Sequence, residues 1–262
     1  MPSIFTLIKI DFMEKLSVKN ICKGFNTLKG RREVLKNVSF ELEEGTFTVI
    51  GGENGSGKSL LMSIIAGLET ADSGTIESFG RAGLVFQEAE TQILGETPKE
   101  DIAFGPKNLG WSRERVKAAV ADALEKTGLT AKKDFPARFL SGGEKRRLAV
   151  ACMLAMDLPL IILDEPYANL DFGGVRQVNA LLRDLKAQKK TIILLTHEIE
   201  KCLALADRFI VLFRGEKVFD GAPEEIVAPA GGAASSDAPV NVEQWNIRNP
   251  FNSYKKITDL LW

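Results

Sequence analysis

One short stretch constrains the fold of this chain more than any other. Residues 46–50 are rich in β-forming side chains and lead into residues 51–59, Gly-Gly-Glu-Asn-Gly-Ser-Gly-Lys-Ser, after which the pattern becomes helical. The spacing from Gly52 to Ser59 is G-x-x-x-x-G-K-S between a strand and a helix, which is typical of a phosphate-binding loop. A flexible glycine turn before a helix would need neither the Lys-Ser pair nor this spacing, so we favour the phosphate-binding interpretation.

Each residue type in this loop has a physical task. Gly52, Gly55 and Gly57 allow backbone angles closed to other residues and leave room for phosphate oxygens, so that successive N–H groups form an anion nest. The start of the following helix adds the positive end of its dipole. Lys58 is suited to reach the β- and γ-phosphates, and the Ser59 hydroxyl is suited to ligate Mg²⁺.

The composition favours a globular protein and argues against nucleic acid as a partner. The chain has 262 residues, 45% of them hydrophobic, with a formal net charge of −1 and a pI near 6.1. No net basic field therefore attracts nucleic acid or an anionic membrane. Three cysteines far apart in the sequence indicate reduced core residues. No apolar run approaches the ~20 residues that span a bilayer, so we expect a soluble chain.

Composition shifts divide the chain into four expected segments. Residues 1–12 are an N-terminal extension, and residues 13–227 form the main domain. Residues 228–240 have the Gly, Ala and Ser content of a flexible linker. Residues 241–262 are expected to form a helical tail, because Tyr254, Ile257 and Leu261 share a helical face, and to pack on the body or on a partner.

Two alternating segments precede the phosphate-binding loop. Residues 16–22 and 38–42 are expected to pair as antiparallel strands, with residues 29–33 as the turn region between them. Phe25 follows the first of these strands. It has two equally favoured interpretations at this point, namely stacking on a nucleotide base or filling the core.

Two further strands end in polar residues. Residues 160–163 form a continuously apolar run that ends in Asp164 and Glu165, and residues 191–196 form another that ends at His197, the only histidine. The carboxyl ends of parallel strands meet at the edge of the sheet where α/β proteins bind ligands. We expect Asp164 to hold Mg²⁺ through water, Glu165 to act on an attacking water, and His197 to contact a γ-phosphate.

A second glycine-containing helix start lies at residues 140–144, Leu-Ser-Gly-Gly-Glu. Ser141 and Glu144 fit a capping box. A capping box does not explain two consecutive glycines, each of which costs about 1 kcal/mol in a helix. A second anion-binding helix terminus explains both features.

Together these segments resemble the nucleotide-binding subunit of ABC transporters over roughly residues 14–227. The resemblance implies an α/β P-loop NTPase core with an antiparallel β subdomain and a helical subdomain that carries the signature motif. It also implies that ATP and Mg²⁺ bind, and that two subunits, as a homodimer or a heterodimer, enclose two ATP molecules head to tail. The signature at residues 140–144 then contacts the ATP of the other subunit.

By this resemblance, functional roles pass to matching positions of the sequence. The catalytic residues are Glu165, His197 and Gln87, and the metal site comprises Ser59, Gln87 and Asp164. The nucleotide-binding residues are Phe25, Gly52, Asn54, Gly55, Ser56, Gly57, Lys58, Ser59, Leu60, Ser141, Gly142, Gly143 and Asp171.

Within ABC ATPases, residues 85–87 with Gln92, residues 101–105 and residues 154–156 look like those of energy-coupling factor importers of vitamins or transition metal ions. This resemblance implies a transmembrane scaffold subunit, a separate substrate-binding membrane subunit, and a peripheral location at the cytoplasmic face of the membrane. We expect residues 87–105 to receive a cytoplasmic helix of the scaffold, with Ile93, Leu94, Ile102 and Phe104 as apolar anchors.

Two positions depart from the pattern of this family. Glu53 stands where many relatives have Pro, and residues 167–169, Tyr-Ala-Asn, replace the commoner Thr-Ala-Gly. Two alternative functions remain open at this point: the motor of an ABC exporter, and a soluble ABC ATPase that acts as a mechanical or assembly factor.

Overall fold

A computed structural model describes residues 15–28, 30–168, 170–226, 240–250 and 257–260. The expected extension at residues 1–12 and nearly all of the expected linker lie outside these ranges, as do Tyr254 and Leu261. Within the described residues, no helix combines the length and the hydropathy that a bilayer-spanning segment requires.

A six-stranded sheet in the order β5-β6-β7-β3-β8-β9 forms the centre of the structure. Its first five strands are parallel, and β9 pairs antiparallel with β8. Leu195 is aligned with both Ile50 and Asp164, so the carboxyl ends of β3, β7 and β6 meet at one edge. The strands are β3 (Phe47–Gly51), β5 (Ala82–Val85), β6 (Leu160–Asp164), β7 (Thr191–Leu195), β8 (Arg208–Phe213) and β9 (Glu216–Gly221).

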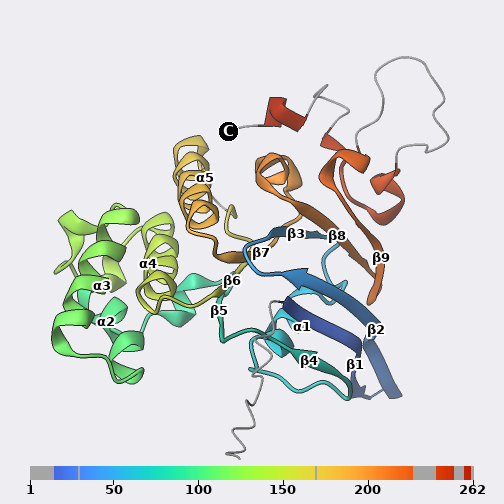
Figure 1. The fold of residues 1–262 in the computed structure, drawn as a ribbon, viewed down its shortest axis with the longest axis horizontal. Coiled ribbons are helices and arrows are strands. Elements are labelled where there is room, and N and C mark those ends of the chain that lie inside the picture. Colours follow the sequence, from blue (N-terminus) through green and yellow to red (C-terminus); the bar gives the residue numbers. More distant parts are fainter. Residues whose placement is uncertain (1–14, 29, 169, 227–239, 251–256, 261–262) are drawn as a thin grey trace, which may run out of the picture.

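A second, antiparallel sheet has the order β2-β1-β4, with β1 (Lys15–Thr27), β2 (Gly30–Glu43) and β4 (Ser73–Glu77). Helix α1 (Lys58–Ile65) lies between the two sheets (Figure 1). Its Leu61 and Met62 are fully buried in one core with residues of both sheets.

The expected turn at residues 29–33 is wrong, because Gly30 to Glu33 already belong to β2. Glu33 pairs with Gly24, and Arg32 pairs with Phe25. Their charged side chains face solvent while their backbone groups extend the ladder, so polarity did not mark the end of the strand. The hairpin is consequently longer than the alternating segments alone indicated.

Two helical regions flank the main sheet. Helix α5 (Phe172–Ala187) packs on the face of the sheet opposite α1. Ile192 and Leu194 of β7 belong to the core under α5, whereas Ile193 and Leu195 belong to the core under α1. Helices α2 (Pro98–Asn108), α3 (Arg113–Lys126) and α4 (Gly142–Ala155) enclose a third core at one end of the molecule (Figure 1). Shorter 3₁₀ helices include Ala89–Gln92, Thr130–Lys132, Ala137–Phe139, Ile199–Lys201, Leu203–Leu205 and Pro223–Ile226.

The described part of the C-terminal tail includes the 3₁₀ turns Val242–Trp245 and Ile257–Leu260 instead of the expected α-helix. The first turn ends at Asn246, whose left-handed backbone (φ 58°) cannot continue an α-helix. Val242 and Leu260 are buried in the α5 core, and the Trp245 ring lies 6.2 Å from that of Phe219 on β9. The described residues of the tail therefore pack on the body of the same chain.

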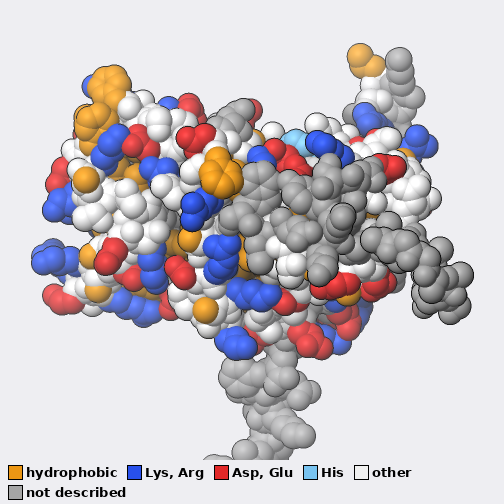
Figure 2. Space-filling view, turned by 90° about the horizontal axis from the view of Figure 1, so that it is seen from above, with side chains coloured by type: hydrophobic (Ala, Val, Ile, Leu, Met, Phe, Trp, Pro, Cys, Tyr) orange, Lys and Arg blue, Asp and Glu red, His pale blue; other side chains and the backbone are white. Residues whose placement is uncertain are grey.

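The surface carries both signs of charge. Lys and Arg side chains alternate with Asp and Glu side chains over the face seen in Figure 2. This mixture agrees with the formal net charge of −1.

A buried hydrogen bond fixes the chain after β6. The Tyr167 hydroxyl, on a fully buried side chain, donates to Asn179 Oδ1 on α5 at 2.6 Å. Tyr167→Phe leaves that buried acceptor unpaired and should lower the free energy of unfolding by about 1–3 kcal/mol. Urea denaturation measures this loss. The exposed hydroxyl removed by Thr70→Val is the control and should leave the midpoint unchanged; equal midpoints for both variants would contradict the role of the buried bond.

Candidate functional site

The loop between β3 and α1 has a backbone that only glycine fits at two points. Gly52 has φ 147°, and a Cβ there would lie 2.1 Å from the carbonyl oxygen of Leu212. Gly57 has φ 100°, and its Cβ would lie 2.7 Å from a methyl carbon of Leu35. These close approaches fix the path of the loop between β8 and the β1–β2 sheet.

The loop forms one wall of a cavity of about 440 Å³. At Gly55 no atom lies within 4 Å of the position of a Cβ, so the space over the loop is open. The cavity is lined by Phe25, Val34, Asn54, Gly55, Gly57, Lys58, Ser59, Leu60, Gln87, Asp164 and Glu165. The structure thus brings together predicted residues from four separate segments of the sequence.

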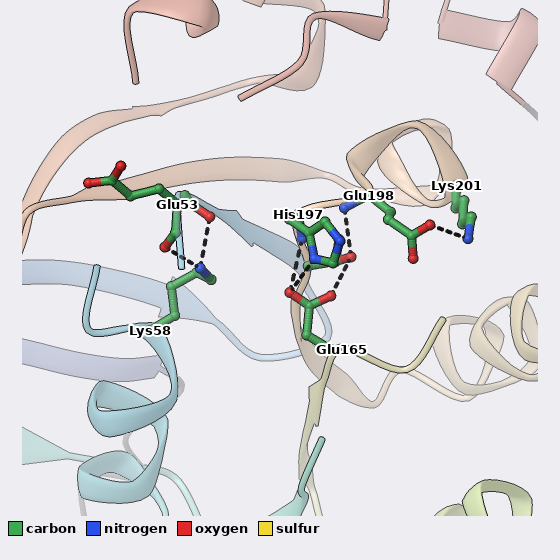
Figure 3. A network of polar contacts seen from close by, with 8 residues as sticks. Glu53, Lys58, Glu165, His197, Glu198 and Lys201 are labelled. Carbon is green, nitrogen blue, oxygen red and sulfur yellow. Dashed lines mark hydrogen bonds and ion pairs between the residues drawn. The ribbon is translucent and has the colours of Figure 1, made fainter. Parts of the chain in front are cut away.

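Lys58 places a positive charge at the base of the loop. The Lys58 residue is 6% exposed. Its ammonium donates to the carbonyl oxygens of Gly52 and Glu53 at 2.8 and 2.9 Å (Figure 3). Burial lowers the pKa of this ammonium, and the charges of Glu165 and Asp164 partly oppose that effect. A phosphate anion in the cavity would compensate the same buried charge.

Asp164 and Ser59 supply neighbouring oxygen atoms. Burial raises the pKa of the Asp164 carboxyl, and a hydrogen bond with Ser59 acts in the opposite direction. Gln87 lines the same cavity. A carboxylate, a hydroxyl and an amide oxygen are hard ligands of the kind that Mg²⁺ prefers, so the residues present fit this ion.

Glu165 is held rigidly from two directions. Its side chain is buried, and Oε2 accepts from the Thr196 hydroxyl at 3.0 Å. Oε1 accepts from the backbone N–H of His197 at 3.1 Å and lies 2.9 Å from His197 Nδ1 (Figure 3). The Glu165 backbone is left-handed (φ 49°), a strained conformation for this residue type and one that concentrates at functional sites.

Sequence reasoning missed Thr196 and Arg146 as parts of this site. Thr196 is the last polar residue before His197, and its place at the end of a buried strand was the available signal. Arg146 on α4 donates to the carbonyl oxygens of Gln87, at 2.9 Å, and of Ala168. Its two bonds join α4 to the segment after β5 and to the segment after β6.

Several predicted residues do not line this cavity. The Ser141 hydroxyl caps α4 in a capping box with Glu144, and Asp171 caps α5 by accepting from the Gly174 N–H at 2.7 Å. The Ser56 hydroxyl is buried without a partner among the described residues. The predicted residues outside the cavity lining are Gly52, Ser56, Ser141, Gly142, Gly143, Asp171 and His197.

Phe25 lies at the mouth of the cavity and is 43% exposed. The alternative that Phe25 fills the core is therefore wrong. Lys23 Nζ lies 5.3 Å from the centre of its ring. An exposed aromatic face at the edge of a phosphate-binding cavity is suited to stack on a nucleobase.

The fold and the site define a P-loop nucleoside triphosphatase. A family profile described as "ABC transporter" matches residues 35–168. The chain belongs to the ABC transporter family of ATP-binding proteins.

The relatives found include energy-coupling factor proteins. The chain is 36% identical over 226 residues to the energy-coupling factor transporter ATP-binding protein EcfA1 of Mycoplasma mobile, covering 81% of each chain. It is 39% identical over 206 residues to EcfA2 of Methanospirillum hungatei, covering 73% of this chain and 52% of that relative. The predicted resemblance to energy-coupling factor ATPases is confirmed.

Solved structures have the same fold. One is cbiO1 from Clostridium perfringens, described as part of the ABC transporter complex cbiONQ, with a TM-score of 0.70 and 31% identity over 80% of this chain and 89% of that one. Another is a dimeric ATP-binding cassette in a post-hydrolysis state bound to ADP and Pi, with a TM-score of 0.73 and 26% identity over 79% and 98% of the two chains. The predicted fold class and ATPase activity are confirmed.

Lys58 offers a direct test of the loop as the triphosphate site. Lys58→Ala removes the buried charge and should weaken ATP binding at least about tenfold, since hydrogen bonds to charged groups contribute about 1.5–3 kcal/mol. Isothermal calorimetry measures the affinity. Lys36→Ala removes an exposed charge that pairs with Glu216 and is the control. Unchanged affinity in Lys58→Ala would refute the assignment.

Proposed function

We propose that this chain is the ATP-hydrolysing subunit of an energy-coupling factor type importer of a vitamin or a transition metal ion. It would act at the cytoplasmic face of the membrane, with a scaffold subunit and a separate substrate-binding membrane subunit. The observation that carries this proposal is Glu165, fixed by Thr196 and His197 on the same cavity as Lys58 and Ser59. The similarity to energy-coupling factor proteins supports the type of transporter.

Nucleotide binding uses the residues of the loop. Lys58 and the N–H groups of residues 54–59 hold the triphosphate, and Phe25 stacks on the adenine. Ser59, Gln87 and Asp164 would hold Mg²⁺, Asp164 through water. When bound, the ion neutralises charge on the β- and γ-phosphates.

Hydrolysis requires a group that accepts a proton from water. Glu165 lines the cavity, and its carboxylate is held by Thr196 and by the His197 N–H. We assign Glu165 as the general base that orients the attacking water. His197, with a side chain that is 55% exposed, is assigned to contact the γ-phosphate.

The signature residues support a dimeric site. Ser141, Gly142 and Gly143 lie at the start of α4 and do not line the cavity of their own chain. A second subunit, identical or related, placed head to tail would bring its own signature helix terminus to this ATP. Each of two sites would then contain residues of both chains.

Glu165→Gln tests this function. The amide keeps the shape of the side chain but cannot accept the proton, so hydrolysis should fall by roughly 10²-fold or more. ATP binding should persist, and an ATP-stabilised dimer should accumulate on size exclusion. Glu198→Gln, which changes a carboxylate paired with Lys201 outside the cavity lining, is the control. Normal hydrolysis in Glu165→Gln, or a monomer at saturating ATP, would contradict the mechanism.

Residues 87–105 are proposed as the surface that receives the scaffold subunit. Leu94 is 68% exposed and Phe104 is 50% exposed, on either side of the start of α2. Ile102, expected as an anchor, is fully buried in the helical core and belongs to the fold. Glu90 pairs with Lys145 of α4 at 3.0 Å, so a movement of this surface would be transmitted to the signature helix.

Leu94→Glu tests the docking surface. A charge on an exposed apolar contact should reduce transport and association with the scaffold subunit while leaving ATP binding by the isolated chain unchanged. Co-purification and transport by reconstituted complexes measure the effect. Leu68→Glu, at a position 62% exposed near the end of α1, is the matched control. Normal assembly and transport in Leu94→Glu would place the coupling contact on another surface.

A further inference from the structure

The C-terminal tail contacts the phosphate-binding loop. Asn246 Nδ2 donates to Glu53 Oε2 at 2.8 Å, although the two residues are 193 positions apart. The next residue, Ile247, is 4% exposed and approaches Gly51, where a Cβ would lie 3.4 Å from its terminal methyl. Glu53 lies in the loop between β3 and α1, so the tail reaches the proposed nucleotide site directly.

The backbone around Asn246 is held in place by hydrogen bonds and by buried neighbours. Its left-handed conformation (φ 58°, ψ 28°) suits Asn, and its N–H donates to the carbonyl oxygen of Glu243 at 3.0 Å. Val242 is fully buried, and the N–H of Val240 donates to the Glu225 carbonyl oxygen at 3.1 Å. The Asn246 amide is thus directed at Glu53 by contacts that belong to the body of the chain.

Glu53 brings a negative charge into a loop that binds anions. Its carbonyl oxygen accepts from the Lys58 ammonium, while its carboxylate points away from Lys58 (Figure 3). Among the described residues, no Lys, Arg or His forms an ion pair with this carboxylate. If the side chain turned inward, it would compete with a triphosphate for Lys58 and repel it.

We propose that Asn246 is a positioning residue that holds the Glu53 carboxylate outside the phosphate-binding loop, so that the C-terminal tail sets the nucleotide affinity of its own chain. A cavity of about 220 Å³ lined by Gly52, Glu53, Asn54, His197, Asn246 and Ile247 places this contact beside the site. The inference rests on the proposed binding of ATP at this loop.

Two variants test the role of Asn246 in the full-length chain. Asn246→Gly removes the amide and keeps a residue suited to the left-handed backbone, so MgATP affinity should fall about threefold to tenfold, the range for one hydrogen bond. Asn246→Asp places a second carboxylate against Glu53 and should weaken affinity further. The loss in Asn246→Asp should shrink at high salt, because salt screens exposed charges.

A double-mutant cycle separates positioning from a structural effect. In a Glu53→Gln background, the loss caused by Asn246→Gly should disappear, since no carboxylate remains to turn inward. Gln244→Ala, at an exposed position of the same turn, is the control. Calorimetry gives the affinities, and thermal melting shows whether each variant is folded.

The outcomes are distinguishable. An equal loss from Asn246→Gly in both backgrounds, or no loss in either, would overturn the role of Asn246. If the unmodified chain failed to bind MgATP, the assignment of the loop itself would fall, and the inference with it.

Discussion

The parallel register of β3, β6 and β7 is the constraint on which the site depends. Each strand is fully buried, so a shift by one residue would exchange its two core faces. In the observed register, Gly51, Asp164 and Leu195 end at the same edge. The loop, the two carboxylates and Thr196 with His197 follow directly, and their proximity is therefore a consequence of core packing.

The parts of the site that the sequence predicted are those fixed by local chemistry. The glycines, Lys58 and Ser59 have a required order, and Asp164 and Glu165 follow an apolar run whose end places them at the sheet edge. The parts that it did not predict depend on contacts distant in sequence. The bond from Arg146 to Gln87 is set by packing between distant segments and leaves no local pattern. Thr196 had a local signal, its place at the end of a buried strand, but its bond to Glu165 depends on the pairing of β6 with β7.

Ser141 shows that two sequence interpretations need not exclude each other. Its hydroxyl and Glu144 form the capping box, which satisfies backbone groups at the start of α4. The capping box does not cover Gly142 or Gly143, which have no side chains of their own. Nothing lies within 4 Å of the position of a Cβ on Gly142. The helix terminus therefore remains accessible to an anion from outside the chain, as a head-to-tail dimer requires.

The energetics of Lys58 connect the fold to ligand binding. Burying an ammonium costs free energy unless hydrogen bonds and opposite charges compensate it, and here two carbonyl oxygens and the nearby carboxylates do so in part. A triphosphate bound at the proposed site would supply the missing negative charge, and would do so only in the folded chain. Ligand that binds the folded state stabilises it by about 2.7 kcal/mol at a hundred times its dissociation constant. The buried charge of Lys58 lowers the free energy of unfolding of the chain without nucleotide. Nucleotide bound at this loop would therefore stabilise the whole domain.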